Sequence, residues 1–125
     1  PPSERSKVLS TLVAQRFIDD NRYAGAYVRE KSRLSGWGAY KIRAALAAKG
    51  IAREIIDEAL AQCDRSSSAE RLAEMLRRKR RSLREVGYPL KGKLMRYGLS
   101  LGYEYDAVVA AVEKLMDQED DNTLE

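Results

Sequence analysis

Two glycines, each standing between two amphipathic runs, place the strongest constraint on the fold of this chain. Gly50 and Gly102 lie 52 residues apart, and each is followed by a large apolar residue, Ile51 or Tyr103. A glycine after a helical run supplies the left-handed residue that ends a helix, and the apolar residue after it folds back onto the last turn. Two such units predict short helices arranged in tandem, which is a scaffold for binding rather than a catalytic cleft.

Apolar residues recur at helical spacing along almost the whole chain, and no alternating run of useful length predicts a strand. The pattern predicts an all-α fold of about seven helices, grouped in threes. A polar stretch at residues 64–68 is the best internal boundary. The expected helices span residues 6–17, 20–34, 38–49, 53–63, 69–85, 90–101 and 104–117.

Two adjacent carboxylates mark the expected start of the second helix. Asp19 or Asp20 is predicted to cap it, because a carboxylate there accepts hydrogen bonds from free N–H groups and suits the helix dipole. With Asp19 as the cap, Ile18 and Tyr23 are placed as a hydrophobic staple. A metal or acid–base pair is the other interpretation of the two carboxylates. Neighbouring residues at a helix start do not point together, so capping is preferred.

The residue types exclude several classes of chemistry. The chain has no histidine and one cysteine, so Ser-His-Asp and Cys-His catalysis, the usual zinc sites and an intramolecular disulfide are excluded. Residues 87–93 match the first seven positions of a phosphate-binding loop, but Leu94 stands where a hydroxyl must reach magnesium. No apolar run approaches the roughly 20 residues that span a bilayer. We therefore expect no enzyme activity, cofactor, metal or membrane partner.

The basic charge is concentrated in the second half of the chain. Residues 65–100 hold eleven Lys and Arg against three Glu, whereas residues 101–125 hold one Lys against eight acidic residues. Like charges at adjacent helical turns repel, so a role in binding phosphates or acidic residues is favoured over a solvated face. The candidate residues are Arg77, Arg78, Arg80, Arg81 and Arg84, extended on the next helix by Lys91, Lys93 and Arg96.

A sparser basic set surrounds the turn at residues 35–38, with Trp37 and Tyr40 among the cations. Aromatic side chains beside cations can stack on bases or anchor a protein interface. Core aromatics flanked by solubilising charges are the alternative, which stays open. The candidate residues of this set are Lys31, Arg33, Trp37, Lys41, Arg43 and Lys49.

The run from Phe17 to Ala24, followed by Tyr27 and Val28, resembles the central signature of the RecX family, the regulators of the recombinase RecA. Residues 38–43, with Lys-Gly-Ile at 49–51, are similar to that family's second repeat, and residues 69–115 to its third. One departure is that the third repeat commonly has Arg-Gly-aromatic, where this chain has Leu-Gly-Tyr at 101–103. The resemblance divides the chain into the last helix of an incomplete first repeat (1–18), a second three-helix repeat (19–64), a third (69–117) and a disordered acidic tail (118–125).

The resemblance implies a non-enzymatic, cytoplasmic protein with an elongated, curved body of tandem three-helix repeats. Such proteins bind RecA or the groove of the RecA–DNA filament and typically inhibit its recombinase, ATPase and coprotease activities in recombination, DNA repair and the SOS response. Some also bind DNA. We expect a monomer whose basic residues meet filament acids or DNA phosphates. A stand-alone helical DNA-binding module is the alternative, because three-helix units are similar in outline to helix-turn-helix domains.

Overall fold

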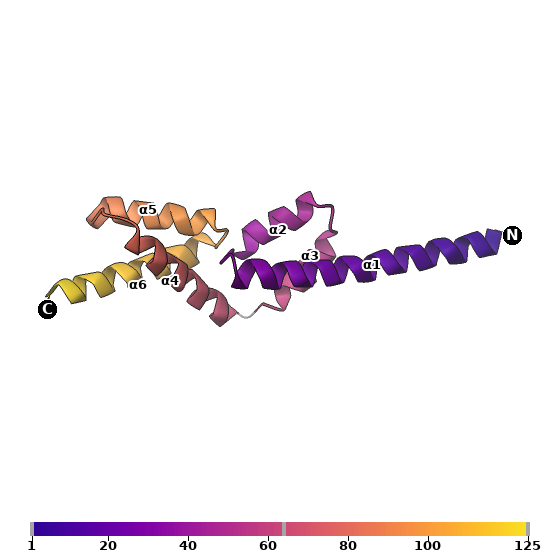
Figure 1. Cartoon of the computed structure of the whole chain (residues 1–125), viewed down its shortest axis with the longest axis horizontal. Helices are drawn as coiled ribbons and strands as arrows, with labels where there is room; N and C mark the ends of the chain where they lie inside the picture. Colours follow the sequence, from indigo (N-terminus) through magenta and orange to yellow (C-terminus); the bar gives the residue numbers. More distant parts are fainter. Residues whose placement is uncertain (1, 64, 125) are drawn as a thin grey trace.

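The computed structural model describes residues 2–63 and 65–124, with side chains for residues 4–63 and 66–120, and its regular structure is all helical. Figure 1 shows an elongated molecule in which α1 reaches one tip and α6 the other. The predicted all-α fold of tandem three-helix units is confirmed, with six helices in the described residues where about seven were expected. The helices are α1 (Pro2–Arg33), α2 (Ala39–Ala48), α3 (Arg53–Ala61), α4 (Arg65–Arg81), α5 (Gly87–Ser100) and α6 (Tyr105–Leu124).

Helix α1 is continuous through the point where the sequence predicted a helix start. Asp19 accepts a hydrogen bond of 3.0 Å from the side chain of Gln15, and Asp20 lies 4.0 Å from Arg16. Both carboxylates therefore bond to the preceding turn of the same helix, a spacing that supports a helix interior. The predicted capping role of Asp19 and Asp20 is wrong, and so is the hydrophobic staple that depended on it.

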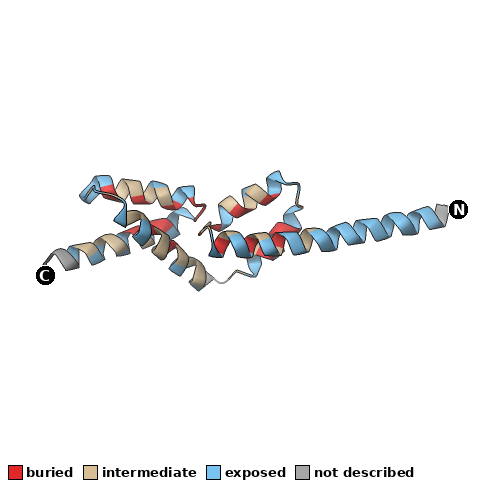
Figure 2. Ribbon diagram, viewed as in Figure 1, coloured by how far each residue is buried: buried red, intermediate tan, exposed pale blue. Residues whose placement is uncertain are grey.

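Each three-helix unit has a core of its own, as the buried residues in Figure 2 show. In the first unit, the C-terminal half of α1 packs with α2 and α3. In the second unit, α4, α5 and α6 pack together. Each fully buried aliphatic side chain contributes about 1.5–3 kcal/mol to folding. The first core centres on Ala24, Val28, Ile42, Leu46 and Ile56, and the second on Leu72, Leu76, Leu90, Leu94, Val108 and Val112.

The two glycines of the repeated pattern end α2 and α5 in the left-handed conformation, with φ of 84° at Gly50 and 93° at Gly102. After α2, the N–H of Gly50 donates to the carbonyl of Ala47 at 3.0 Å, and that of Ile51 to the carbonyl of Leu46 at 3.1 Å. These two bonds form a Schellman motif. The N–H of Gly102 likewise donates to a carbonyl three residues earlier, at 3.0 Å.

A joint made largely of backbone connects the two units. The N–H of Gly38 donates to the carbonyl of Leu101 at 2.7 Å, and the hydroxyl of Tyr103 donates to the carbonyl of Gly36 at 2.9 Å. A Cβ at Gly38 would lie 2.5 Å from the carbonyl oxygen of Gly102. Only glycine permits so close an approach of two backbones, so the joint holds the units in a fixed relation.

Helix α6 continues through Leu124, where the sequence predicted a disordered tail at residues 118–125. The last residue of that tail, residue 125, lies outside the described part of the chain. Glu119 forms an ion pair with Arg80 of α4, which gives this end of α6 a contact with its own unit. None of the described helices combines the length and the apolar character needed to cross a bilayer.

Candidate functional site

Three lysines of the first unit converge on two aromatic rings. We call Tyr27, Lys31, Trp37, Lys41 and Lys49 the lysine–aromatic cluster. The Nζ atom of Lys31 lies 4.9 Å from the ring centroid of Trp37 and 5.5 Å from that of Tyr27. Lys41 Nζ lies 4.5 Å from the Trp37 centroid, and Lys49 Nζ lies 5.8 Å from the Tyr27 centroid. The rings themselves meet edge to face at 6.4 Å. Cation–π attraction thus gathers three ammonium groups over one small area.

The lysines of this cluster have no carboxylate partner among the described residues. None of the three lysines forms an ion pair with a carboxylate in the part of the chain that the structure describes. Three uncompensated ammonium groups attract anions, whether phosphates or carboxylates. Trp37 is half-buried and packs against both cores, and two lysines lie over its ring. Its packing fits the core-aromatic interpretation, and its contact with a partner stays a prediction.

Two predicted residues of the first unit lie outside the cluster. Arg43 forms an ion pair with Asp57 of α3. Arg33, near the end of α1, lines a separate cavity between α1, α3 and α4. The structure therefore brings together Lys31, Trp37 and Lys41 with Lys49, but it does not add the two arginines to them.

The basic run on α4 is partly neutralised by its own unit. Arg77 and Arg78 both pair with Glu74, at 2.8 and 3.2 Å. These contacts, above all the hydrogen bond from Arg77, hold the pKa of Glu74 below its ordinary value. Arg80 pairs with Glu119 of α6 in a partly buried contact. Much of this positive charge is therefore already engaged inside the protein.

The predicted cations of α4, α5 and the turn between them form what we call the α4–α5 basic patch: Arg77, Arg78, Arg80, Arg81, Arg84, Lys91, Lys93 and Arg96. Beyond the three paired arginines, it holds one paired lysine and, within the described residues, four unpaired cations. Lys93 pairs with Glu85 in the turn before α5, and this hydrogen bond is the main cause of the lowered pKa of Glu85. The cations of this patch that form no ion pair with another described residue are Arg81, Arg84, Lys91 and Arg96.

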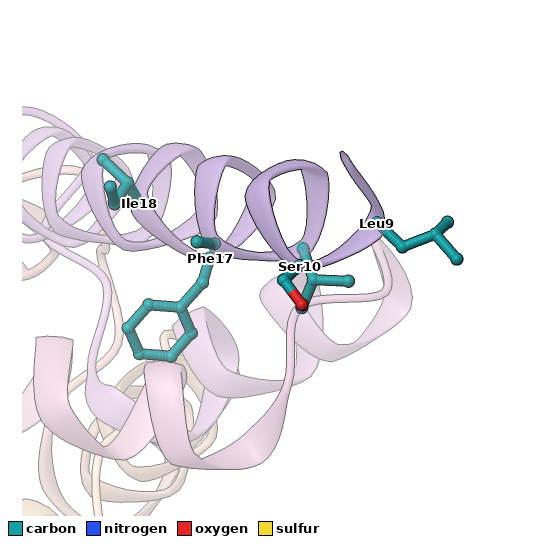
Figure 3. A pocket seen from close by; sticks show the side chains of 6 residues that line it. Leu9, Ser10, Phe17 and Ile18 are labelled. Carbon is teal, nitrogen blue, oxygen red and sulfur yellow. The ribbon is translucent and has the colours of Figure 1, made fainter. Parts of the chain in front are cut away.

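An exposed apolar stripe follows the N-terminal half of α1. Leu9, Val13, Phe17 and Ile18 border a shallow surface cavity along this helix (Figure 3). Leu9 is 63% exposed and Phe17 is 57% exposed. This face of α1 is therefore largely open to solvent. Exposed apolar patches are typical of surfaces that contact other proteins.

No group of three or more acidic, cysteine or histidine side chains in the described residues is arranged to hold a metal ion.

The sequence reasoning missed three residues that the structure places at these sites. Tyr27 belongs to the lysine–aromatic cluster, and its spacing of four residues from Lys31 on one helix is a signal that predicts their contact. Arg29 and Arg71 line the same cavity as Arg33. They come from α1 and α4, and no local pattern indicates that meeting.

Comparison with known proteins shows the fold and a similarity to one family. The protein-family model described as "RecX, second three-helix domain" matches residues 19–60, which make up most of the first unit. The crystal structure of RecX from Lactobacillus salivarius superposes with a TM-score of 0.75 at 24% identity, over 90% of this chain and 73% of that chain. That similarity shows a common fold.

Curated relatives extend the match to both units. Regulatory protein RecX of Clostridium botulinum (strain Eklund 17B / Type B) is 32% identical over 117 residues, which are 91% of this chain and 54% of the relative. The protein of the same name from Clostridium tetani (strain Massachusetts / E88) is 34% identical over 113 residues, 88% of this chain and 51% of the relative. The chain thus spans about half the length of these curated relatives. With the signature at residues 17–28, these matches make the chain similar to proteins of the RecX family over both three-helix units.

Proposed function

We propose that this chain binds RecA, or the groove of the RecA–DNA filament, and lowers the recombinase, ATPase and coprotease activities of RecA. The observation that best supports this function is the similarity to regulatory proteins named RecX over 117 residues, which takes in both three-helix units. The chain acts in the cytoplasm as a monomer, without catalytic activity, cofactor or metal of its own. Its role lies in recombination, DNA repair and the SOS response.

The shape of the molecule suits a repeating partner. Two units in line, held by the joint between Gly38 and Leu101, form one elongated body. A body of this kind can lie along a filament and contact adjacent subunits at the same time. Because the joint fixes the second unit once the first has bound, the second contact is made at a high effective concentration.

Charge supplies the contacts in this proposal. The lysine–aromatic cluster offers three ammonium groups that have no carboxylate partner among the described residues. The unpaired cations of the α4–α5 basic patch offer a second positive surface on the other unit. Filament acids and DNA phosphates are both suitable anions. Contacts of this exposed kind act mainly on the association rate and on its salt dependence.

A titration separates this function from the alternative of a stand-alone DNA-binding module, which the unpaired lysines also support. The chain is added to RecA-coated single strand, to bare single strand and to bare duplex at one fixed salt concentration. We expect a strong preference for the coated strand and a fall in its ATPase rate. Equal affinity for bare duplex would favour the DNA-binding module, and binding without any change in ATPase rate would contradict regulation of RecA.

A set of variants tests the basic run. Changing Arg77, Arg78, Arg80 and Arg81 together to Ala should weaken binding to the coated strand. Arg53→Ala is the matched control, because this exposed arginine of α3 lies outside both basic surfaces and makes only a 3.9 Å pair with Asp57. Unchanged binding of the fourfold variant at physiological salt would exclude the run as a contact.

A further inference from the structure

A polar cavity lies where the first unit meets α4, on a side of α1 different from the lysine–aromatic cluster. Its volume is about 260 Å³, against about 30 Å³ for a water molecule in the liquid. Three arginines line it: Arg29 and Arg33 from α1, and Arg71 from α4. Residues 29 and 33 are one helical turn apart, whereas Lys31 lies between them in sequence and so faces another direction. The cavity is therefore distinct from the cluster.

The arginines of this cavity form no ion pair in the described part of the chain. None of the described residues that line it is a carboxylate. Arg71 is the sharpest case, because its Nε atom is buried and has no hydrogen-bond acceptor among the described residues. A buried donor without an acceptor loses its hydration and gains nothing in return. Three positive charges around one cavity also repel one another. An anion in the cavity would relieve both costs.

The local sequence leaves room for a ligand among these groups. A Cβ at Gly25 would lie 3.3 Å from Nη1 of Arg29, so the absence of a side chain there lets this guanidinium lie along the helix beside the cavity. The side chains of Gln62 and Ser67, from the α3–α4 connection and the first turns of α4, add neutral polar groups to the lining. The cavity thus combines charged donors with polar groups from several elements.

We propose that this cavity binds a phosphate group. The guanidinium groups approach from two helices of different units, so their donors come from several directions. A tetrahedral phosphate presents acceptor oxygens in several directions, whereas the acceptors of a carboxylate lie in one plane, so the phosphate suits this arrangement of donors better. Inorganic phosphate and a phosphodiester of single-stranded nucleic acid share this chemistry. The proposal concerns the chain alone and does not depend on binding to RecA.

Occupancy of this cavity also bears on the joint. The positive charge of Arg71, together with a hydrogen bond from its side chain, partly opposes the rise in the pKa of Tyr103 that burial causes, so Arg71 already contacts Tyr103 through a guanidinium nitrogen other than the unsatisfied Nε. Tyr103 in turn donates its hydroxyl hydrogen to Gly36 across the joint. A phosphate held by Arg29, Arg33 and Arg71 would link α1 to α4 and strengthen the connection between the units.

The test follows the Nε–Hε signal of Arg71 by NMR while inorganic phosphate is added at constant ionic strength, with chloride as the balancing anion. We expect a saturable shift, and an affinity about tenfold or more weaker in the double variant Arg29→Gln, Arg33→Gln. Both substituted side chains are exposed, so the fold should persist, and circular dichroism checks it. Arg53→Gln, at an exposed arginine that does not line the cavity, is the matched control and should bind as the unchanged chain does.

Two further arms decide the source and the outcome. In one arm a short single-stranded oligonucleotide replaces free phosphate. If the Arg71 Nε–Hε signal shifts with the oligonucleotide but not with free phosphate, the site binds a phosphodiester. In the other arm, Asp64→Asn removes the carboxylate that follows the lining residue Cys63 in sequence and lies outside the described residues. Binding that appears only in this variant would show that the chain's own carboxylate holds the site. That result, or the absence of saturation with both ligands, would overturn the proposal.

Discussion

In the first three-helix unit the corner after α2 faces open space, whereas in the second unit the corner after α5 faces the first unit. A Cβ placed at Gly50 would have no heavy atom within 4 Å, but one placed at Gly102 would lie 2.4 Å from the amide nitrogen of Lys41. The backbone conformation is nearly the same at both glycines. One local device, a helix end, is therefore used twice, and only the second copy also forms the joint.

The largest expected effect is the difference between Gly102→Ala and Gly50→Ala. At either position an alanine in the left-handed region costs about 1–2 kcal/mol. At Gly102 the new methyl group also strikes the backbone of Lys41, so we expect the free energy of unfolding to fall by more than about 3 kcal/mol. Urea unfolding of the two variants measures this difference.

Gly50→Ala is the matched control for the joint, because it carries the same backbone strain without the clash. In Gly102→Ala, hydrogen exchange should speed up at the amides of Gly38 and Tyr40, which donate across the joint at 2.7 and 3.0 Å. Equal loss of stability in both variants, with unchanged exchange, would show that the two corners do not differ in the way the structure indicates.

The parts of the fold that were predicted correctly depend on local signals. The helix-ending role of Gly50 and Gly102 follows from an amphipathic run, a glycine and an apolar residue, all within one or two turns. The predicted helix start at Asp19 is wrong, because a residue type that often caps a helix also fits inside one when a residue one turn away can bond to it, as Gln15 does. The joint could not be predicted, since Tyr103 and Gly36 are 67 residues apart.

The contacts of the candidate site are likewise of two kinds: some follow from residue spacing on one helix, and others depend on how the helices pack. The contact of Lys31 with Tyr27 and the neutralisation of Arg77 by Glu74 follow from spacings of four and three residues on one helix. By contrast, the approach of Lys49 to the ring of Tyr27 depends on how α2 packs on α1. Sequence charge alone favoured the dense run on α4, but it gives no measure of how much of that charge the fold itself neutralises.

The second prediction compares the cations of the two units at equal charge. Replacing Lys31, Lys41 and Lys49 together by Gln should weaken binding to RecA-coated single strand by about tenfold or more. These lysines pair with no carboxylate in the described structure, so their full charge is available to the filament. Because these charges act at the surface, salt screens them, and the loss of binding should become smaller as the salt concentration is raised. Equilibrium binding at two salt concentrations measures both effects.

Its control removes the same number of charges from the second unit. The variant Arg77→Gln, Arg78→Gln, Arg80→Gln takes away arginines that are already paired with Glu74 or Glu119, so binding should fall by less. Circular dichroism checks that both triple variants remain folded. An equal or larger loss in the arginine variant would reverse the assignment of the stronger contact to the first unit.

The third prediction concerns the side chain that crosses the joint. Tyr103→Phe removes the hydroxyl that donates to the buried carbonyl of Gly36 at 2.9 Å, and we expect a loss of about 1 kcal/mol in the free energy of unfolding. Tyr97→Phe is the matched control, because the hydroxyl of Tyr97 makes no hydrogen bond in the described structure. If both variants lose the same stability, the bond across the joint contributes nothing of its own.

The smallest expected effect is a pH dependence confined to the second unit. The hydrogen bond from Lys93 holds the pKa of Glu85 below its ordinary value, so the folded state favours the ionised carboxylate. Its contribution to stability is present above the ordinary pKa of Glu and is lost as the pH falls through the lowered value. In Lys93→Gln the pKa of Glu85 should rise toward the ordinary value, which an NMR titration of the carboxyl group measures.

A lysine of the first unit provides the contrast for this titration. Lys49→Gln should leave the titration of Glu85 unchanged, because Lys93 is the lysine that bonds to Glu85, whereas Lys49 lies over Tyr27. A rise in the pKa of Glu85 in Lys49→Gln would show that this lysine acts on the second unit. The lowered pKa of Glu85 would then not be specific to its bond with Lys93, and internal pairing of charge would not be the feature that separates the two units.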